Sequence, residues 1–118
     1  MRVTLHPDVD LRWHGKEGQW ELLSPVVCAV DRKDIVVPPG FRTDLASIPR
    51  AVRSITPQVG KHIPAAIVHD WLYKMGERSR KEADKIFLAA MKHLGVYGLR
   101  RWAMYGAVRG FGWMAWGK

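Results

Sequence analysis

The chain has 118 residues and a mass of 13.5 kDa, which fits one domain spanning residues 1–118. Its composition, 47% hydrophobic and 25% charged, excludes global disorder. The single cysteine, Cys28, excludes the disulfide-stapled scaffolds of small secreted proteins. The formal net charge is +8, of which residues 60–118 carry +7. A basic half is typical of a surface that meets phosphate groups, in lipid or in nucleic acid.

Neither a signal peptide nor a membrane span is expected. The first residues contain no apolar run of the kind that a signal peptide needs. No stretch of about 18 apolar residues is present either, so no helix is predicted to cross a bilayer.

Residues 1–45 are predicted to be β-rich. Alternating or β-branched runs indicate two antiparallel hairpins, residues 11–13 with 20–22 and residues 26–30 with 35–37. Residues 31–34 form the polar connection of the second hairpin. Cys28 lies within an apolar strand, where a buried, unreactive thiol is expected.

Residues 46–62 are predicted to be a functional loop region. Proline and glycine recur from residue 38 to residue 60, and a short helical turn is predicted around Ser47–Ser54. So long a connection within a small domain usually carries function.

Residues 63–118 are predicted to be helical. Pro64 suits the start of a helix that Gly76 ends, and Ser79 opens a capping box for a second helix that ends at Gly95. A third helix is predicted from about Leu99 to Trp113. Within it, the small residues Gly106 and Gly110 predict a packing groove. The fold class is therefore α+β, with N-terminal antiparallel hairpins followed by two or three packed helices.

Three side chains of the first two helices point to acid–base chemistry. His69 and Tyr73 are four residues apart and share a helix face. If the two helices pack antiparallel across their short turn, Asp84 faces back toward both. A carboxylate there would hold one imidazole tautomer and stabilise its protonated form, while Tyr73 donates to the same carboxylate. His69, Asp84 and Tyr73 are therefore the candidate catalytic residues.

Two other interpretations of this region remain open. In a purely structural one, Asp70 pins a loop through Arg42, Arg50 or Arg53, and His69 bonds a buried carbonyl. In another, histidines and carboxylates form a zinc or manganese site. Its candidate ligands are His62, His69, Asp70 and Asp44.

Two sequence blocks carry a family resemblance. Residues 40–50 (GFRTDLASIPR) and 65–73 (AAIVHDWLY) resemble a family of small tailed-phage and prophage proteins that is catalogued as a domain of unknown function. The resemblance covers roughly residues 20–95. It implies a phage protein that is made in the bacterial cytoplasm, where it is available for association with the virion, and it implies no activity.

A second resemblance suggests chemistry. The pattern from Ala66 to Phe87 is similar to the two helices of phospholipase A2, in the disulfide-free version found in the parvovirus capsid. The likeness implies that His69 activates a water molecule and that Asp70 is a calcium ligand. The loop around Gly40 would supply backbone carbonyls to the Ca²⁺, with Asp44 as an extra ligand.

The C-terminal segment mixes arginines with aromatic residues, among them Trp102, Trp113 and Trp116. This composition indicates a contact surface for anionic lipid or for another phage protein. Nucleic acid is a less favoured partner, because no known reading motif is present. The leading hypothesis is a phage-encoded, calcium-dependent hydrolase of lipid esters that acts during host entry or lysis. The alternative is a non-enzymatic virion or accessory protein that binds a protein partner through its basic, Trp-rich helices.

Overall fold

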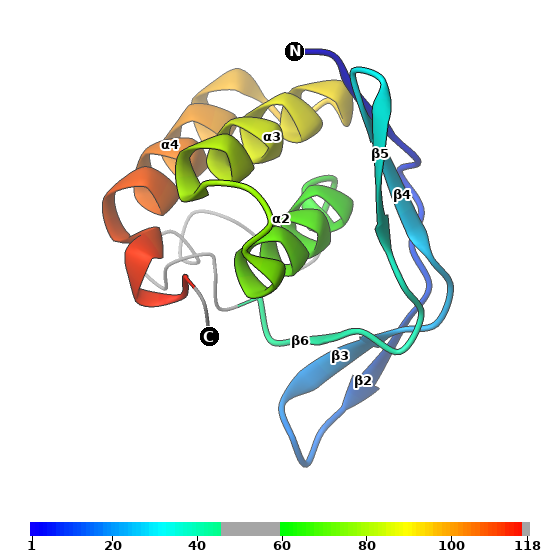
Figure 1. The fold of residues 1–118 in the computed structure, drawn as a ribbon. Helices are drawn as coiled ribbons and strands as arrows, with labels where there is room; N and C mark the ends of the chain where they lie inside the picture. Colours follow the sequence, from blue (N-terminus) through cyan, green and yellow to red (C-terminus); the bar gives the residue numbers. More distant parts are fainter. Residues whose placement is uncertain (46–59, 117–118) are drawn as a thin grey trace.

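The computed structural model describes residues 1–45 and 60–116, in which six strands precede three α-helices and a short 3₁₀ helix (Figure 1). The strands form two antiparallel sheets of three strands each. The predicted α+β class is confirmed. The helical turn predicted around Ser47–Ser54 lies outside the described residues.

The first sheet has the order β1-β4-β5, and the side chains on one of its faces are apolar and buried. Its strands are β1 (Val3–Leu5), β4 (Val26–Val30) and β5 (Lys33–Val37). Side chains alternate along β4, so that Val26, Cys28 and Val30 are buried while Val27 is exposed. Cys28 is fully buried, and this burial raises the pKa of its thiol to about 11, as expected of an unreactive cysteine.

The β4–β5 hairpin has a tighter turn than the sequence predicts. The ladder continues to the pair Val30–Lys33, so the turn contains two residues rather than the four of segment 31–34. Asp31 adopts the left-handed conformation (φ 54°) that such a turn needs, and its carboxylate accepts a hydrogen bond from the backbone of Arg2 at 2.8 Å. Lys33 and Asp34 remain exposed within the strand, so pairing them costs no burial of charge.

The second sheet has the order β2-β3-β6 and contains the first predicted hairpin. Its strands are β2 (Leu11–His14), β3 (Gln19–Leu22) and β6 (Arg42–Thr43). After the turn at Gly40, where φ is 91°, β6 pairs with β3. This pairing carries Thr43 back under the helices, where it is buried.

The helical half begins with α2 (Ile63–Met75) and α3 (Arg80–His93), close to the predicted bounds. Gly76 ends α2 in the left-handed conformation, and the Ser79 side chain caps α3 by accepting a hydrogen bond from the backbone of Glu82 at 3.1 Å. Next come α4 (Gly98–Phe111) and η1 (Gly112–Met114), which together match the third predicted helix.

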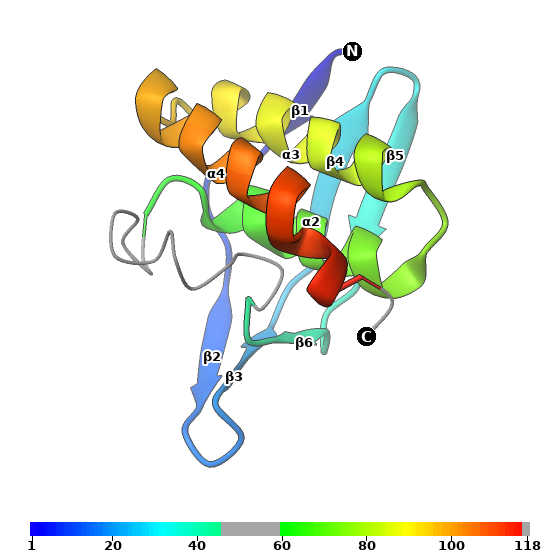
Figure 2. The same ribbon diagram turned by 90° about the vertical axis from the view of Figure 1, so that its left-hand side faces the viewer.

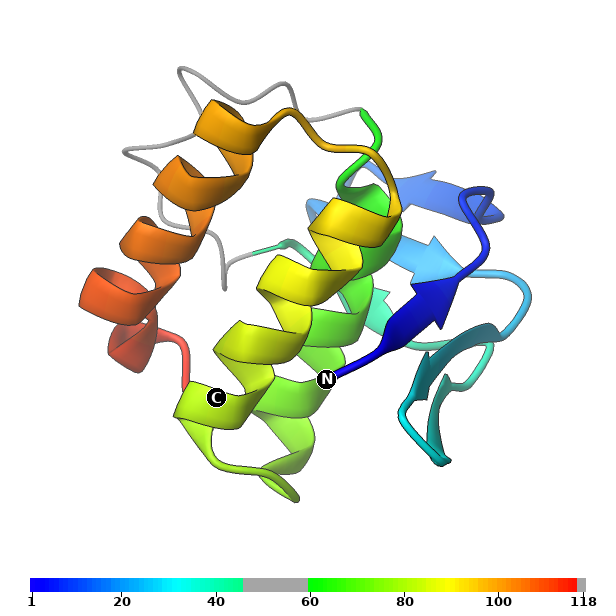
Figure 3. The same cartoon turned by 90° about the horizontal axis from the view of Figure 1, so that it is seen from above.

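The helices stack side by side against the strands. Viewed from above, α4 is outermost, α3 lies in the middle, and the strands lie on the far side (Figure 3). α3 contacts α2, α4 and β1, while α2 also contacts β4 and β5. Ten residues of α2 are buried, so this helix is the centre of the domain.

The predicted packing groove at Gly106 and Gly110 is wrong. Both glycines are exposed, and a Cβ added at either would meet no atom within 4 Å. α4 instead packs inward through Met104 and Val108, which are fully buried. The larger apolar side chains face α3 because they bury more surface than glycine does.

Candidate active site

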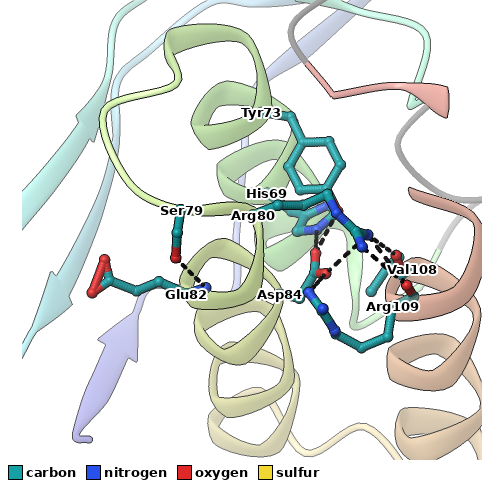
Figure 4. A network of polar contacts seen from close by, with 8 residues as sticks. All are labelled: His69, Tyr73, Ser79, Arg80, Glu82, Asp84, Val108 and Arg109. Carbon is teal, nitrogen blue, oxygen red and sulfur yellow. Dashed lines mark hydrogen bonds and ion pairs between the residues drawn. The ribbon is translucent and has the colours of Figure 1, made fainter. Parts of the chain in front are cut away.

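His69 and Asp84 meet in the interior between α2 and α3 (Figure 4). The imidazole Nε2 lies 2.7 Å from the Asp84 Oδ1, and both side chains are fully buried. Tyr73, one helical turn after His69, donates its hydroxyl to the same Oδ1 at 2.5 Å. The contact expected from the antiparallel helix pair is therefore present, and it joins all three candidate catalytic residues.

Two arginines that sequence reasoning missed complete the cluster. The Arg109 Nη1 of α4 donates to the Asp84 Oδ2 at 2.8 Å, and the Arg80 Nη1 lies 3.6 Å from the same oxygen. Arg80 also donates to the carbonyls of Val108 and Arg109 near the end of α4. The i,i+4 spacing of Arg80 and Asp84 is visible in the sequence. Arg109 comes from another helix, and no local pattern indicates it.

The surroundings of Asp84 keep its carboxylate charged. Burial alone would raise its pKa, but the hydrogen bonds from His69, Tyr73 and Arg109 outweigh this effect and hold the pKa below its usual value. Burial, and then the bond to Asp84, raise the pKa of Tyr73, so its hydroxyl stays protonated and donates.

The second nitrogen of His69 has no hydrogen-bond partner among the described residues. Because a charged carboxylate only accepts, Nε2 must carry a proton, and in the neutral tautomer this leaves a lone pair on Nδ1. Nδ1 is buried and bonds to no residue of 1–45 or 60–116. The ring lies between Tyr73 and Phe87, with centroid distances of 4.2 and 4.6 Å. A basic nitrogen oriented by a carboxylate is the arrangement that general-base catalysis uses.

Asp70 lies on α2 next to His69 but has different neighbours. It is 4% exposed, and its Oδ2 accepts a hydrogen bond from the Thr43 hydroxyl of β6. Thr43 in turn accepts a bond from the backbone of Leu45 at 2.9 Å. Asp70 thus helps to hold the chain after β6 against α2.

The other two predicted calcium ligands, Gly40 and Asp44, lie at exposed positions. Gly40 lies in the turn before β6, where its amide donates to the Leu22 carbonyl at 2.6 Å, and the Asp44 side chain is exposed. Calcium at Asp70, Asp44 and Gly40 stays a prediction.

The carbonyls of the proposed calcium loop already accept hydrogen bonds. The Phe41 carbonyl accepts from the Leu22 amide at 2.9 Å, and the Arg42 carbonyl accepts from the Lys74 ammonium at 3.3 Å. The same ammonium lies 5.2 Å from the centre of the Phe41 ring. Across residues 1–45 and 60–116, no group of three or more His, Cys, Asp or Glu side chains is arranged to hold a metal ion.

A cavity of about 620 Å³ opens between the β2–β3 hairpin and the start of α2. Its lining includes Trp20, Thr43 and Ile67. Through Thr43 it borders the Asp70 contact, but none of the three candidate catalytic residues lines it.

Comparison with known proteins assigns the family. Residues 20–108 match the family described as "Protein of unknown function (DUF1353)". The chain belongs to this family. The resemblance to a family of unknown function, drawn from the two sequence blocks, is thereby confirmed.

One curated relative is an uncharacterised protein, y4jT, of Sinorhizobium fredii. It is 36% identical over 78 residues, which are 64% of this chain and 23% of the relative. The chain therefore matches less than a quarter of that protein. No solved structure matches the chain significantly. Within the described ranges, the helices are too short or too polar to cross a membrane.

Proposed function

We propose that the protein is a hydrolase in which His69 is the general base and Asp84 orients it. The observation that carries this proposal is the His69–Asp84 bond of 2.7 Å together with the Nδ1 on the other side of the ring, which has no partner in the part of the chain that the structure describes. A buried imidazole that serves only as a structural link would be expected to use both of its nitrogens.

The chemistry follows from the two ring nitrogens. His69 Nδ1 removes a proton from water, and the resulting hydroxide attacks the carbonyl carbon of an ester. The imidazolium is stabilised by Asp84, whose charge Arg109 and Tyr73 hold in place. It then returns the proton to the departing alkoxide, so that one ester and one water become an acid and an alcohol.

Lipid esters are the proposed substrates. The phospholipase A2-like spacing of His69, Tyr73 and Asp84 supports this choice, and so does the net charge of +7 in residues 60–118, which suits an anionic lipid surface. Calcium would polarise the ester carbonyl if it bound near Asp70. The proton transfers assigned to His69 do not require calcium. The carbonyls of Phe41 and Arg42, in the loop proposed to bind it, each accept a hydrogen bond.

The test is fatty-acid release from mixed phosphatidylglycerol and phosphatidylcholine vesicles, with calcium and with chelator. We expect His69→Gln to lower the rate by at least about 100-fold, the usual contribution of a general base. His93→Gln changes an exposed histidine at the end of α3 and is the matched control. Background release by the wild type under both conditions would refute the proposal, as would equal rates for wild type and His69→Gln when circular dichroism shows both folded.

A non-enzymatic role is the second candidate. The full burial of His69 favours it, because water reaches Nδ1 only if neighbouring side chains move. In this case the His69–Asp84 pair is a core link, and the protein acts by binding a partner through its basic, Trp-rich helices. Background fatty-acid release by the folded wild type in the assay above would support this second role.

We also propose an association with phage particles, which rests on the likeness of residues 40–50 and 65–73 to small phage and prophage proteins. Mass spectrometry of purified particles from an induced host that carries the gene tests it. Peptides of the protein should copurify with the particles, and their absence from particles but presence in the lysate would contradict virion association.

A further inference from the structure

The outer face of α4 is an apolar strip that no described element covers. We define this outer face as Leu99, Trp102, Gly106 and Gly110, whose spacing places them on one side of the helix, together with the exposed Trp113 of the following η1. Leu99, Trp102 and Trp113 are 77%, 57% and 63% exposed. In Figure 2 this side of the molecule faces the viewer, and α4 lies in front of the other helices.

Further large apolar side chains are exposed near both ends of α4. Tyr97 precedes α4 and is 73% exposed, while Phe111, the last residue of α4, and Met114 of η1 are 54% and 48% exposed. A small domain rarely leaves so many large apolar groups together in water unless they mark an interaction site.

The C-terminal part of the chain that contains this face carries charge of one sign. After Asp84 the chain contains six lysines and arginines and no acidic side chain. Arg100 of α4 and Lys92 in the last turn of α3 are both exposed. A second copy of the chain would bring positive charge against positive charge, whereas an anionic surface complements it.

We propose that this outer face docks on an anionic lipid bilayer, with α4 lying in the plane of the interface. Tryptophan rings suit the boundary between headgroups and acyl chains, and neighbouring basic residues meet the lipid phosphates. α4 has 14 residues, about 21 Å of helix, which is too short to span the apolar core of a bilayer.

Docking on this face identifies the surface through which a lipid-ester hydrolase would meet its substrate. In this respect the docking proposal rests on the proposed function. The inner side of the same helix supplies Arg109 to the Asp84 carboxylate at 2.8 Å. The face that would meet lipid and the arginine that bonds the Asp84 carboxylate therefore belong to one element.

The experiment measures binding without turnover. The full chain is mixed with vesicles of ether-linked phosphatidylglycerol and phosphatidylcholine, which contain no ester to hydrolyse, and bound protein is recovered by flotation. We expect binding that requires phosphatidylglycerol and weakens with salt. Trp102→Ser with Trp113→Ser should weaken it by at least about tenfold, because two exposed indoles no longer insert.

Three further variants sharpen the result. Trp13→Ser is the matched control, since Trp13 is 53% exposed on the β2–β3 hairpin, which projects away from the helices (Figures 1 and 2). It should bind like the wild type. Arg100→Gln should weaken binding about fivefold, the usual contribution of one basic residue near an anionic surface. His69→Gln should bind normally even if hydrolysis is lost, so the two proposals fail separately.

Two outcomes would overturn docking on lipid. One is that the wild type does not bind the vesicles, or that the wild type and the double tryptophan variant bind equally while melting curves show that both are folded. The other is a dimer in light scattering that the double variant dissolves, without vesicle binding, which would make a second copy the occupant.

Discussion

Replacing Asp84 with asparagine should destabilise the protein by about 3 kcal/mol, because a buried charge is removed from partners that remain. The carboxylate is fully buried and accepts hydrogen bonds from His69, Tyr73 and Arg109 at 2.7, 2.5 and 2.8 Å. Hydrogen bonds to a charged group contribute about 1.5–3 kcal/mol each and are not additive. The asparagine amide keeps an oxygen that accepts from one or two of these donors, but its N–H groups face the remaining donors. A part of the summed hydrogen-bond energy is therefore lost.

The loss should be visible in thermal melting. Unfolding entropies of about 2.1 cal/mol/K per residue imply about 4 °C of Tm for each kcal/mol in a chain of this length, so the Tm should fall by about 12 °C. Circular dichroism melts and urea titrations at pH 7 measure it. The matched control is Glu82→Gln on the same helix, whose side chain is 44% exposed and lies 3.6 Å from Arg78. This exposed pair should change stability by less than about 1 kcal/mol.

The pH dependence provides a second check on Asp84. Its pKa in the folded protein lies below the ordinary 3.8, so its contribution to stability is fully present above about pH 4 and is lost as the pH falls through the folded-state pKa. The difference between wild type and Asp84→Asn should therefore shrink at acidic pH. A loss at pH 7 no larger than that of Glu82→Gln would refute the reasoning, because the cluster would then contribute nothing to the fold.

Other substitutions test the packing around this cluster and the helix ends. Gly112→Ala should lower the free energy of unfolding by about 1–3 kcal/mol, because its Cβ would lie 2.5 Å from the buried Tyr73 hydroxyl. Gly110→Ala, in open space on the same chain segment, should raise the free energy of unfolding by about 0.5–1 kcal/mol. Equal urea midpoints for the two variants would contradict this packing. Ser79→Ala removes the cap of α3 and should cost about 1 kcal/mol, so an unchanged urea midpoint would argue against the cap. Burial lowers the pKa of His62 in the folded protein, so stability should fall as the pH drops below about 6.5, and His62→Gln should flatten that slope; a slope shared by both proteins would assign it to another group.

Much of the fold could be predicted because its signals are local. The hairpins follow from alternation and β-branched runs, and the ends of α2 and α3 follow from Gly76 and Ser79, since capping involves only neighbouring residues. The four-residue connection 31–34 was wrong because a two-residue turn with Asp31 in a left-handed conformation lets the ladder take up two more residues. Periodicity does not reveal such a turn.

The candidate site divides in the same way. Helix geometry places His69 and Tyr73 on one face, and the short link between α2 and α3 brings Asp84 back to them, so the contact could be predicted although its catalytic role stays a prediction. The Thr43–Asp70 bond could not, because a two-residue strand 27 residues upstream makes it.

What the sequence by itself determined is the two hairpins, the three helices and the meeting of His69 with Asp84, because all of these follow from patterns within short stretches of the chain, whereas β1 and β6 were not predicted. Only the tertiary structure decided that Arg109 bonds Asp84 from 25 residues away and that one nitrogen of His69 has no partner among the described residues. It also decided that Gly106 and Gly110 face outward between exposed tryptophans rather than inward against α3. These features depend on which side of α4 buries more apolar surface, a competition that is settled only when all the helices pack together.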